Sequence, residues 1–415
     1  MTKRLIIIVT ILFTVITTAQ EGTSSPYSFY GIGLNTFKGT VENQSMGGLS
    51  IYSDSIHVNL RNPAAYSKLR LTTYTVAGSH SLMKLQSNGL EESSTVTTLD
   101  YLAIGIPAGK FGFGFGLIPY SSVGYNLISI NEDEGTAGRY SGNGGVNRVF
   151  LSAGFQVTDN LSLGAKADYN FGTLENRNIF VREGLQYGSR EYNSSQLSGL
   201  TFNLGLNYER MLNDRLELKT SAYYTPEREI DSRNSREFAT ITFTSAGDEI
   251  VTDVLNVEMA DTDITLPSEY SVGAGIGQPR KWFLGAEYVN RGASDYNNRS
   301  FATEGATYSS ASTYRLGGFY IPNYNSLTSY FSRIVFRGGV RMEETGLNLQ
   351  GESIDEFGIS FGVGLPAGRL FSNANLGFEY GQRGTTNAGL IKEDFFKVMI
   401  SLSLNDKWFI QRKFE

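Results

Sequence analysis

Apolar and polar residues alternate one by one along much of the chain beyond residue 70. Phe and Leu alternate with Gly in residues 111–117, and apolar residues alternate with Ser, Gly, Lys, Asp and Asn in residues 161–171. The same period of two returns in residues 202–208, 357–365 and 396–404. Successive side chains of a β-strand point to opposite faces of its sheet. The pattern therefore predicts strands with one apolar face and one polar or glycine-rich face.

These strands have the length that a transmembrane β-barrel needs. Strands of about ten residues with an apolar outer face and a polar inner face cross a bilayer when they close into a barrel. The alternation predicts fourteen such strands, an even number. They lie near residues 71–83, 95–106, 111–119, 147–157, 161–171, 199–210, 215–225, 268–277, 282–290, 312–320, 333–342, 357–365, 373–381 and 394–404.

Short and long connections alternate between the predicted strands. The short connections are residues 107–110, 158–160, 211–214, 278–281 and 366–372, and the long polar ones are residues 120–146, 172–198, 226–267, 291–311, 343–356 and 382–393. Outer-membrane barrels have short periplasmic turns and long extracellular loops, whereas a water-soluble β-sandwich has no reason to collect its long loops at one end. We therefore predict an all-β, transmembrane outer-membrane β-barrel over residues 71–404. It would be surrounded by outer-membrane lipid and lipopolysaccharide, with both chain ends in the periplasm.

The first nineteen residues have the organisation of a secretory signal peptide. Lys3 and Arg4 precede an apolar run over residues 5–16, and small residues follow up to Ala19. This run is too short for a membrane anchor, which needs about 20 apolar residues. We predict cleavage between Ala19 and Gln20, which directs the mature chain to the envelope of a Gram-negative cell.

The composition excludes several classes of chemistry. The 415 residues contain no Cys and 2 His, which excludes thiol nucleophiles, disulfides, Cys-ligated metals and a lipid anchor on cysteine. Nothing beside His57 or His80 marks a nucleophile, so we predict no catalytic residue, no enzyme activity, no cofactor and no metal site. Removing Lys3 and Arg4 from 35 basic residues leaves 33 against 41 acidic ones, a mature charge of −8 that argues against nucleic-acid binding.

Residues 20–70 lack sustained alternation, and a barrel of fourteen strands encloses a lumen that its own side chains do not fill. We therefore predict that this segment is a plug inside the barrel, with a periplasmic tail as the alternative. Charged residues at inward positions would cross-link plug and wall in a structural network, which we favour over a conduction path. The predicted lumen residues are Lys166, Asp168, Glu209, Glu287, Arg333, Arg337, Arg341, Glu379 and Lys397.

Two further segments carry charge outside the predicted strands. Residues 226–267 contain ten acidic and three basic residues, a net charge of −7, and fit a solvated acidic loop better than a Ca²⁺ site because EF-hand spacing is missing. Alternation in residues 238–244 would extend a hairpin above the membrane or meet a partner. Residues 405–415 form a basic and aromatic periplasmic tail. The residues predicted for a partner contact in this tail are Trp408, Phe409, Arg412 and Lys413.

Several short motifs stand out against this pattern: Ser45-Met46-Gly47-Gly48-Leu49-Ser50, Asp54-Ser55, Asn62-Pro63-Ala64-Ala65, Phe115–Tyr120, Leu266–Gly273 and Trp282–Tyr288. Together they resemble motifs of the long-chain fatty acid transporter family (FadL/TodX type). The resemblance implies a fourteen-stranded barrel with an N-terminal hatch, in agreement with the strand count. It also implies uptake of hydrophobic compounds that leave sideways through the wall, with Asn62, Pro63 and Ala64 as hatch residues that gate the ligand. The alternative is that Asn62-Pro63 turns the chain into the first strand, because Pro fixes φ and removes a donor.

Two functions follow from these features. The first is passive uptake of a hydrophobic small molecule, such as a fatty acid, through a hatch and a lateral opening, and the hatch-like motif before fourteen strands favours it. The alternative is a non-transporting FadL-like barrel that serves as an accessory or scaffold subunit of a larger outer-membrane secretion or barrel-assembly complex. The charged lumen, the acidic segment 226–267 and the tail beyond residue 404 are the features behind this second function.

Overall fold

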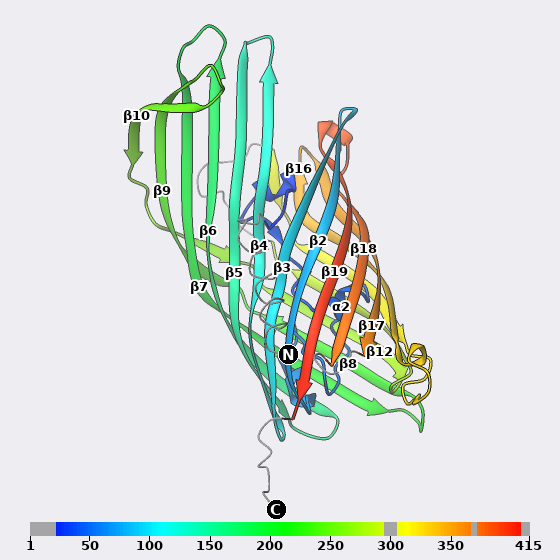
Figure 1. Ribbon diagram of the computed structural model, residues 1–415. Coiled ribbons are helices and arrows are strands. Elements are labelled where there is room, and N and C mark those ends of the chain that lie inside the picture. Colours follow the sequence, from blue (N-terminus) through cyan, green and yellow to red (C-terminus); the bar gives the residue numbers. More distant parts are fainter. Residues whose placement is uncertain (1–21, 294–304, 367–371, 408–415) are drawn as a thin grey trace, which may run out of the picture.

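The structure is a computed structural model that describes residues 22–293, 305–366 and 372–407. Within these ranges fourteen antiparallel strands close into a barrel, because the last strand pairs with the first from Lys392↔Gln86 to Asp406↔Thr72 (Figure 1). The prediction of a fourteen-stranded all-β barrel is confirmed. The barrel strands are β2 (Thr72–Ser87), β3 (Leu90–Ala108), β4 (Phe111–Asn131), β5 (Thr136–Gln156), β6 (Leu161–Arg182), β7 (Gly188–Met211), β8 (Glu217–Thr225), β12 (Glu269–Gln278), β13 (Trp282–Arg291), β15 (Ala311–Tyr320), β16 (Val335–Leu349), β17 (Glu352–Pro366), β18 (Asn373–Arg383) and β19 (Lys392–Asp406).

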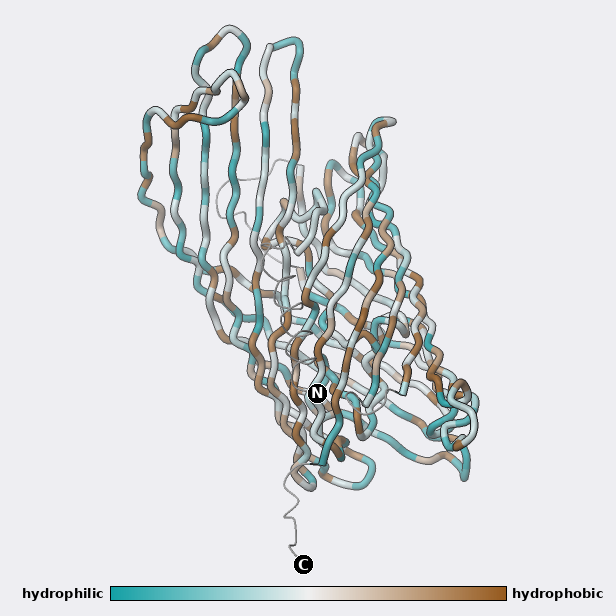
Figure 2. Tube along the Cα trace, in the orientation of Figure 1, coloured by the Kyte–Doolittle hydropathy of each residue, from teal (hydrophilic) through white to brown (hydrophobic). Residues whose placement is uncertain are grey.

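The alternation separates an apolar outer surface from a polar inner wall. On β4, Phe111, Phe113 and Phe115 are 48%, 42% and 52% exposed, whereas the glycines between them are buried. Figure 2 shows hydrophobic and hydrophilic residues alternating along the other strands as well. The inward positions of β6 include Lys166 and Asp168, both buried. An apolar outer face suits lipid, and the buried polar groups of the inner face need partners inside the barrel.

The wall is much taller on one side, where β4–β7 rise far beyond the other strands (Figure 1). These four strands have 21, 21, 22 and 24 residues, about twice the length that crosses a bilayer. β9 (Arg228–Phe243) continues this sheet beside the first half of β7, and β10 (Glu249–Val257) and β11 (Thr262–Leu266) pair with β9. We call residues 120–146, 172–198 and 228–266 the extension.

The interpretation of residues 120–146, 172–198 and 226–267 as polar loops is wrong, since most of these residues are β-strand. A sheet beyond the membrane meets water on its outer face, so polar residues occupy both faces and the period-two pattern fades. Residues 238–244 kept a visible alternation, and they lie largely within β9, in the hairpin that β9 and β10 form. The strands of the extension were therefore not detected from the sequence, because no membrane imposes a period of two on them.

Residues 22–70, which we call the N-terminal segment, lie inside the barrel (Figure 1). The elements of this segment are short: η1 (Pro26–Phe29), β1 (Leu34–Asn35), α2 (Val41–Gln44) and η2 (Pro63–Lys68). Pro26 and Pro63 stand in the first turn of η1 and η2, where a missing N–H leaves no intrahelical bond unmade. The remaining elements are β14 (Ala306–Tyr308), η3 (Phe331–Arg333) and η4 (Asn387–Gly389). No helix in the described part of the chain has the length and apolar character that crossing a membrane requires.

Candidate functional site

Carboxylates of the inner wall hold the N-terminal segment through charge-assisted hydrogen bonds. Glu287 of β13 accepts two bonds from Ser50, at 2.6 Å from the backbone N–H and 3.0 Å from Oγ. Glu209 of β7 accepts a hydrogen bond from Ser53 Oγ at 2.7 Å, and Lys68 Nζ lies 3.2 Å from the same carboxylate. Bonds to an ionised group are stronger than neutral ones. The segment is therefore tied to wall strands that are far apart in the sequence.

Asn62 connects the start of η2 to the barrel wall. Its Oδ1 accepts the N–H of Ala64 at 2.9 Å and so caps the helix. Its Nδ2 lies 2.7 Å from Ser221 Oγ and 2.8 Å from Asn207 Oδ1, on β8 and β7. Asn62, Pro63 and Ala64 are all buried. The structure thus places the three residues of the predicted motif together, packed against the wall.

Glycines of the wall leave room for the backbone of the segment. A Cβ added to Gly205 would lie 2.0 Å from Asn62 Oδ1. A Cβ added to Gly112 would lie 1.8 Å from the carbonyl oxygen of Tyr66. Both distances are far below van der Waals contact, so a larger residue at either position would displace the segment. Gly112 and Gly114, which alternate with Phe on β4, therefore allow the close approach of wall and segment at Tyr66.

One cluster of predicted lumen charges surrounds Arg341 of β16. Its guanidinium contacts Glu343 at 3.0 Å, Glu379 at 2.9 Å, and Glu356. Gln44 of α2 donates a hydrogen bond to Glu379 at 2.6 Å. The cluster therefore joins the N-terminal segment to β16, β17 and β18.

The other predicted lumen residues on strands lie on the inner wall as well. Glu287 pairs with Arg315 of β15 at 3.1 Å, and Glu209 pairs with Lys219 of β8 at 3.0 Å. Both pairs are largely buried, and charges balance at each: Glu287 meets Arg315, while Glu209 and Glu217 together meet Lys219 and Lys68. The remaining members are Lys166 and Asp168, whose charged atoms lie 3.4 Å apart, Arg337, which donates to Asn375, and Lys397, which lines a cavity.

Arg333 does not lie on the strand predicted for it. β16 begins at Val335, and Arg333 ends the short helix η3, with its guanidinium 5.6 Å from the centre of the Tyr330 ring. The prediction that Arg333 points inward assumed that the strand already includes residue 333. Because Arg333 lies in a helical turn before β16, strand alternation does not determine its direction. Six further predicted residues lie outside the described ranges: Ala19, Gln20, Trp408, Phe409, Arg412 and Lys413.

The barrel wall has a lateral gap between β3 and β4. Pairing joins residues 102–108 of β3 to residues 111–117 of β4 and stops there, although both strands continue. Beyond that point β1 of the N-terminal segment takes the place of β3, with Asn35 opposite Ser121. The segment thus covers part of the β4 edge that β3 leaves.

A cavity of about 900 Å³ lies between the N-terminal segment and the wall and reaches the β3–β4 gap. Pockets for hydrophobic ligands are lined mainly by apolar and aromatic side chains. Here charged groups contribute much of the lining, among them Lys38, Arg61, Glu269, Arg315, Arg341 and Glu379. Apolar and aromatic side chains such as Phe37, Val41 and Leu99 also line the cavity, so its wall is mixed.

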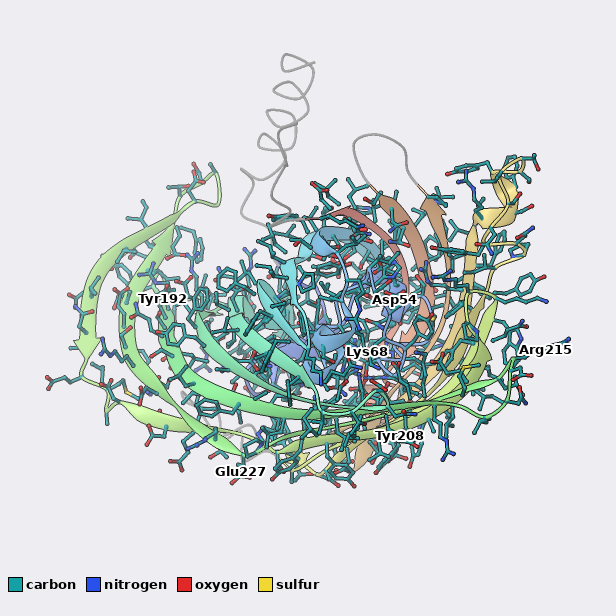
Figure 3. All side chains as sticks on the ribbon, turned by 90° about the horizontal axis from the view of Figure 1, so that it is seen from below. Asp54, Lys68, Tyr192, Tyr208, Arg215 and Glu227 are labelled. Atoms are coloured by element: carbon teal, nitrogen blue, oxygen red, sulfur yellow. The ribbon has the colours of Figure 1, made fainter. Side chains whose placement is uncertain are left out.

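Asp54 and His57 form an ion pair in the N-terminal segment, with His57 Nδ1 2.7 Å from Asp54 Oδ2. Figure 3 shows Asp54 and Lys68 inside the ring of strands. Burial by itself raises the pKa of Asp54, but His57 and the backbone N–H groups of Ile56 and His57 lower it to about 2. Burial lowers the pKa of His57, and the Asp54 carboxylate more than offsets this, so the pKa of His57 is raised. No group of three or more His, Asp and Glu within the described ranges is arranged to hold a metal ion.

Sequence reasoning missed four charged residues of the interior: Arg61 and Arg148, which are buried, and Lys38 and Glu269, which are half-buried. Arg148 and Glu269 lie on β5 and β12 at inward positions, and the parity of these strands could have identified both. Lys38 and Arg61 belong to the N-terminal segment, which has no period from which to infer a direction. Only the path of the chain through the barrel brings them to the wall.

Solved structures with a similar fold are outer-membrane channels. The crystal structure of the Pseudomonas putida toluene transporter TodX aligns with a TM-score of 0.60 at 16% identity, over 90% of this chain and all of that one. A Pseudomonas aeruginosa FadL homologue aligns with a TM-score of 0.57 at 13% identity, over 90% of this chain and 98% of that one. None of the curated proteins compared with the chain matches it. A family model described as BamG matches residues 1–415.

Proposed function

The chain belongs to the BamG family, and on this premise we propose that it is a non-transporting outer-membrane barrel that serves as an accessory subunit of a larger membrane complex. The complex would be of the secretion or barrel-assembly type. The observation that carries the proposal is the fastening of the N-terminal segment to the wall by Ser50, Ser53, Asn62 and Lys68. A segment held in this way acts as a fixed plug.

The charged interior supports the same function. A hydrophobic ligand in the cavity would strip water from groups such as Arg315, Arg341 and Glu379 without offering them hydrogen bonds. These charges are already paired inside the barrel, Arg315 with Glu287 and Arg341 with Glu379. Each of their polar atoms that loses water without gaining another partner costs about 1–3 kcal/mol. An apolar compound therefore gains little binding free energy from entering the cavity. A structural role for these charges does not require that they lose water to a ligand.

The extension is the part of the barrel that we assign to partner contact. It stands above the membrane-spanning strands, and its β10 exposes Ile250, Val254 and Leu255, at 46%, 45% and 62%. Residues 226–267 carry a net charge of −7. Exposed apolar side chains among charges are typical of protein interfaces. In this arrangement both chain ends lie in the periplasm, where the tail residues Trp408, Phe409, Arg412 and Lys413 form a second contact.

Affinity purification of the tagged full-length protein in mild detergent tests the proposal. We expect another outer-membrane protein to copurify in stoichiometric amounts, because an accessory subunit has a standing partner. A variant with Val254→Asp and Leu255→Asp should lose that partner and still fold. Leu90→Asp is the matched control, since Leu90 is 77% exposed at the tip of the β2–β3 hairpin, away from the extension. Purification of the wild-type barrel alone in full yield would contradict the proposal.

Passive uptake of a hydrophobic small molecule is the second candidate. The gap between β3 and β4 beside the cavity favours it, as does the similarity of the fold to a toluene transporter. Extraction of the purified protein with organic solvent, followed by mass spectrometry, tests this candidate. A stoichiometric fatty acid or aromatic compound would support uptake. If the purified protein contains no such compound and a deletion strain takes up these compounds normally, uptake is excluded and the accessory function remains.

A further inference from the structure

Four cationic side chains gather where the N-terminal segment meets the wall. Lys38 and Arg61 come from the segment, Arg148 from β5 and Lys166 from β6. The side chains of Arg61, Arg148 and Lys166 are 5–7% exposed, and that of Lys38 is 14% exposed. We call these four residues the cationic recess. Long cationic side chains are rarely buried to this extent unless they are paired.

Two carboxylates face the cationic recess. Asp168 lies 3.4 Å from both Arg148 and Lys166. Glu269 lies 3.6 Å from Arg61 and 4.0 Å from Lys38. Arg291 also lines the recess and has a contact of its own. Counted without Arg291, the described residues bring four positive charges against two negative charges, an excess of two positive charges.

Neighbouring clusters do not supply the missing negative charge. Glu287, the next carboxylate along the wall, is already paired with Arg315 at 3.1 Å. The cluster around Lys219 holds two lysines and two carboxylates, because Lys68 and Lys219 face Glu209 and Glu217. The charge excess is therefore local to the cationic recess.

The four cations converge on one space. Lys38 Nζ lies 4.0 Å and the Arg148 guanidinium carbon 4.3 Å from the centre of the same ring, that of Tyr120. All four residues line a small recess that shares Lys38 and Arg61 with the lining of the main cavity. An ion could therefore reach the recess from the cavity and lie in the space that all four residues line.

Asn203 adds an independent sign of a missing partner. It lines the recess, and its Oδ1 is buried without a hydrogen-bond partner among the described residues. Its Nδ2 lies 2.9 Å from Thr225 Oγ1. Rotating the amide by half a turn would let the Thr225 hydroxyl donate to Oδ1 and would place the N–H₂ group where Oδ1 now lies. Asn203 would then offer an N–H donor on the lining of the recess.

Excess buried charge must be neutralised, either by a bound counter-ion or by loss of a proton. Burial lowers the pKa of Lys38 to about 7, with Glu269 opposing this and Arg148, Arg291 and Arg61 adding to it. Loss of one proton from Lys38 would still leave one excess positive charge. A bound anion neutralises the recess without that proton loss.

We infer that the cationic recess binds a phosphate-type oxyanion that bridges the N-terminal segment to the barrel wall. Guanidinium groups donate paired N–H bonds that match the oxygens of phosphate, and the ammonium groups add point charges. The oxyanion is either free inorganic phosphate or the phosphomonoester headgroup of a lipid. It latches the segment to the wall, because Lys38 and Arg61 belong to the segment while Arg148 and Lys166 belong to the wall. This site does not depend on the function proposed above.

Equilibrium dialysis of the purified full-length barrel against radiolabelled inorganic phosphate, at constant ionic strength in chloride, tests the inference. We expect one phosphate per chain. Lys38→Met should weaken binding about tenfold or more, the loss expected for one charge-assisted hydrogen bond. Lys166→Met is a second variant on the wall side, and heat-modifiable migration on gels verifies that each variant is folded.

Lys84→Met is the control. Lys84 lies on β2, is half exposed, pairs with Glu91 and does not line the cationic recess, so this variant should bind phosphate as the wild type does. No phosphate binding by the wild type, or unchanged binding by both folded recess variants, would overturn the inference.

Short-chain phosphatidic acid, with the matching diacylglycerol as its control, distinguishes the two sources of phosphate. Phosphatidic acid that binds far more tightly than inorganic phosphate identifies a lipid headgroup. Equal affinities identify the free ion. Binding of diacylglycerol alone would contradict the inference, because it carries no phosphate.

Discussion

Asn62 Nδ2 lies 2.7 Å from Ser221 Oγ, while the Oδ1 of the same amide caps η2 through the N–H of Ala64. One side chain therefore starts a helix of the N-terminal segment and fastens it to β8. Asn62→Ala removes both functions and should destabilise the docked segment by about 2–4 kcal/mol, the sum of a lost cap and a lost buried hydrogen bond. Tryptic cleavage after Arg61 and Lys68 should accelerate, while the barrel keeps its heat-modifiable migration.

Asn62→Asp separates the two functions of this side chain. The carboxylate keeps an acceptor for the Ala64 N–H, but it cannot donate to the carbonyl oxygens of Leu206 and Ala222, which accept from Asn62 Nδ2 and would now face a negative charge. It should therefore release the segment nearly as well as Asn62→Ala does. If both variants resist trypsin as the wild type does, the wall contact does not hold the segment.

The Glu287–Arg315 pair predicts that the stability of the barrel depends strongly on keeping these two buried charges balanced. Glu287→Gln leaves the Arg315 guanidinium buried beside a neutral amide and should lower the free energy of unfolding by about 3–5 kcal/mol. The double variant Glu287→Gln with Arg315→Met removes the stranded charge and should recover part of that loss. Urea unfolding followed by tryptophan fluorescence measures all three proteins. Additive losses in the double variant would refute the coupling.

We predict that Glu249, at the start of β10, stabilises the extension but not the rest of the barrel. It contacts Arg190 at 2.7 Å and also pairs with Arg177. Both pairs are partly exposed, so Glu249→Gln should cost only about 0.2–1 kcal/mol per pair. Chymotryptic cleavage in residues 243–257 should accelerate while the unfolding midpoint of the barrel stays unchanged. Glu258→Gln, on an exposed residue just beyond β10, is the control and should leave cleavage unchanged.

The Asp54–His57 pair predicts a pH-dependent contribution to the stability of the N-terminal segment. The raised pKa of His57 means that its share of the stability is full below pH 6.5 and is lost as the pH rises through the higher folded value. The lowered pKa of Asp54 means that its share is present above pH 3.8 and is lost as the pH falls through about 2. Proton NMR of the His57 ring should give a midpoint above 6.5, and Asp54→Asn should lower it. A His80→Gln variant assigns the signal, and a midpoint insensitive to Asp54→Asn would disprove the pairing.

Residue patterns predicted the membrane-spanning part of the fold because lipid imposes a period. Phe111, Phe113 and Phe115 must all face the bilayer, so their spacing identifies a strand without any knowledge of its neighbours. The same parity places Glu287 and Arg341 inside. It fails for Arg333, where a helical turn precedes β16, and for residues 172–198, where a sheet in water carries polar residues on both faces. Residue alternation therefore identifies a strand only where the two faces of that strand meet different surroundings, such as lipid on one side and the polar interior on the other.

By itself the amino-acid sequence determined a fourteen-stranded barrel with a charged interior, because alternation is a local property that lipid enforces. Only the tertiary structure decided where the N-terminal segment lies, since that segment has no period and its position depends on contacts such as Asn62 with Ser221. Tertiary structure likewise brought Lys38 and Arg61 beside Arg148 and Lys166, residues separated by about a hundred positions in the chain. Their charge excess is a property of packing, because charges add up only among groups that the fold places within a few ångströms of one another.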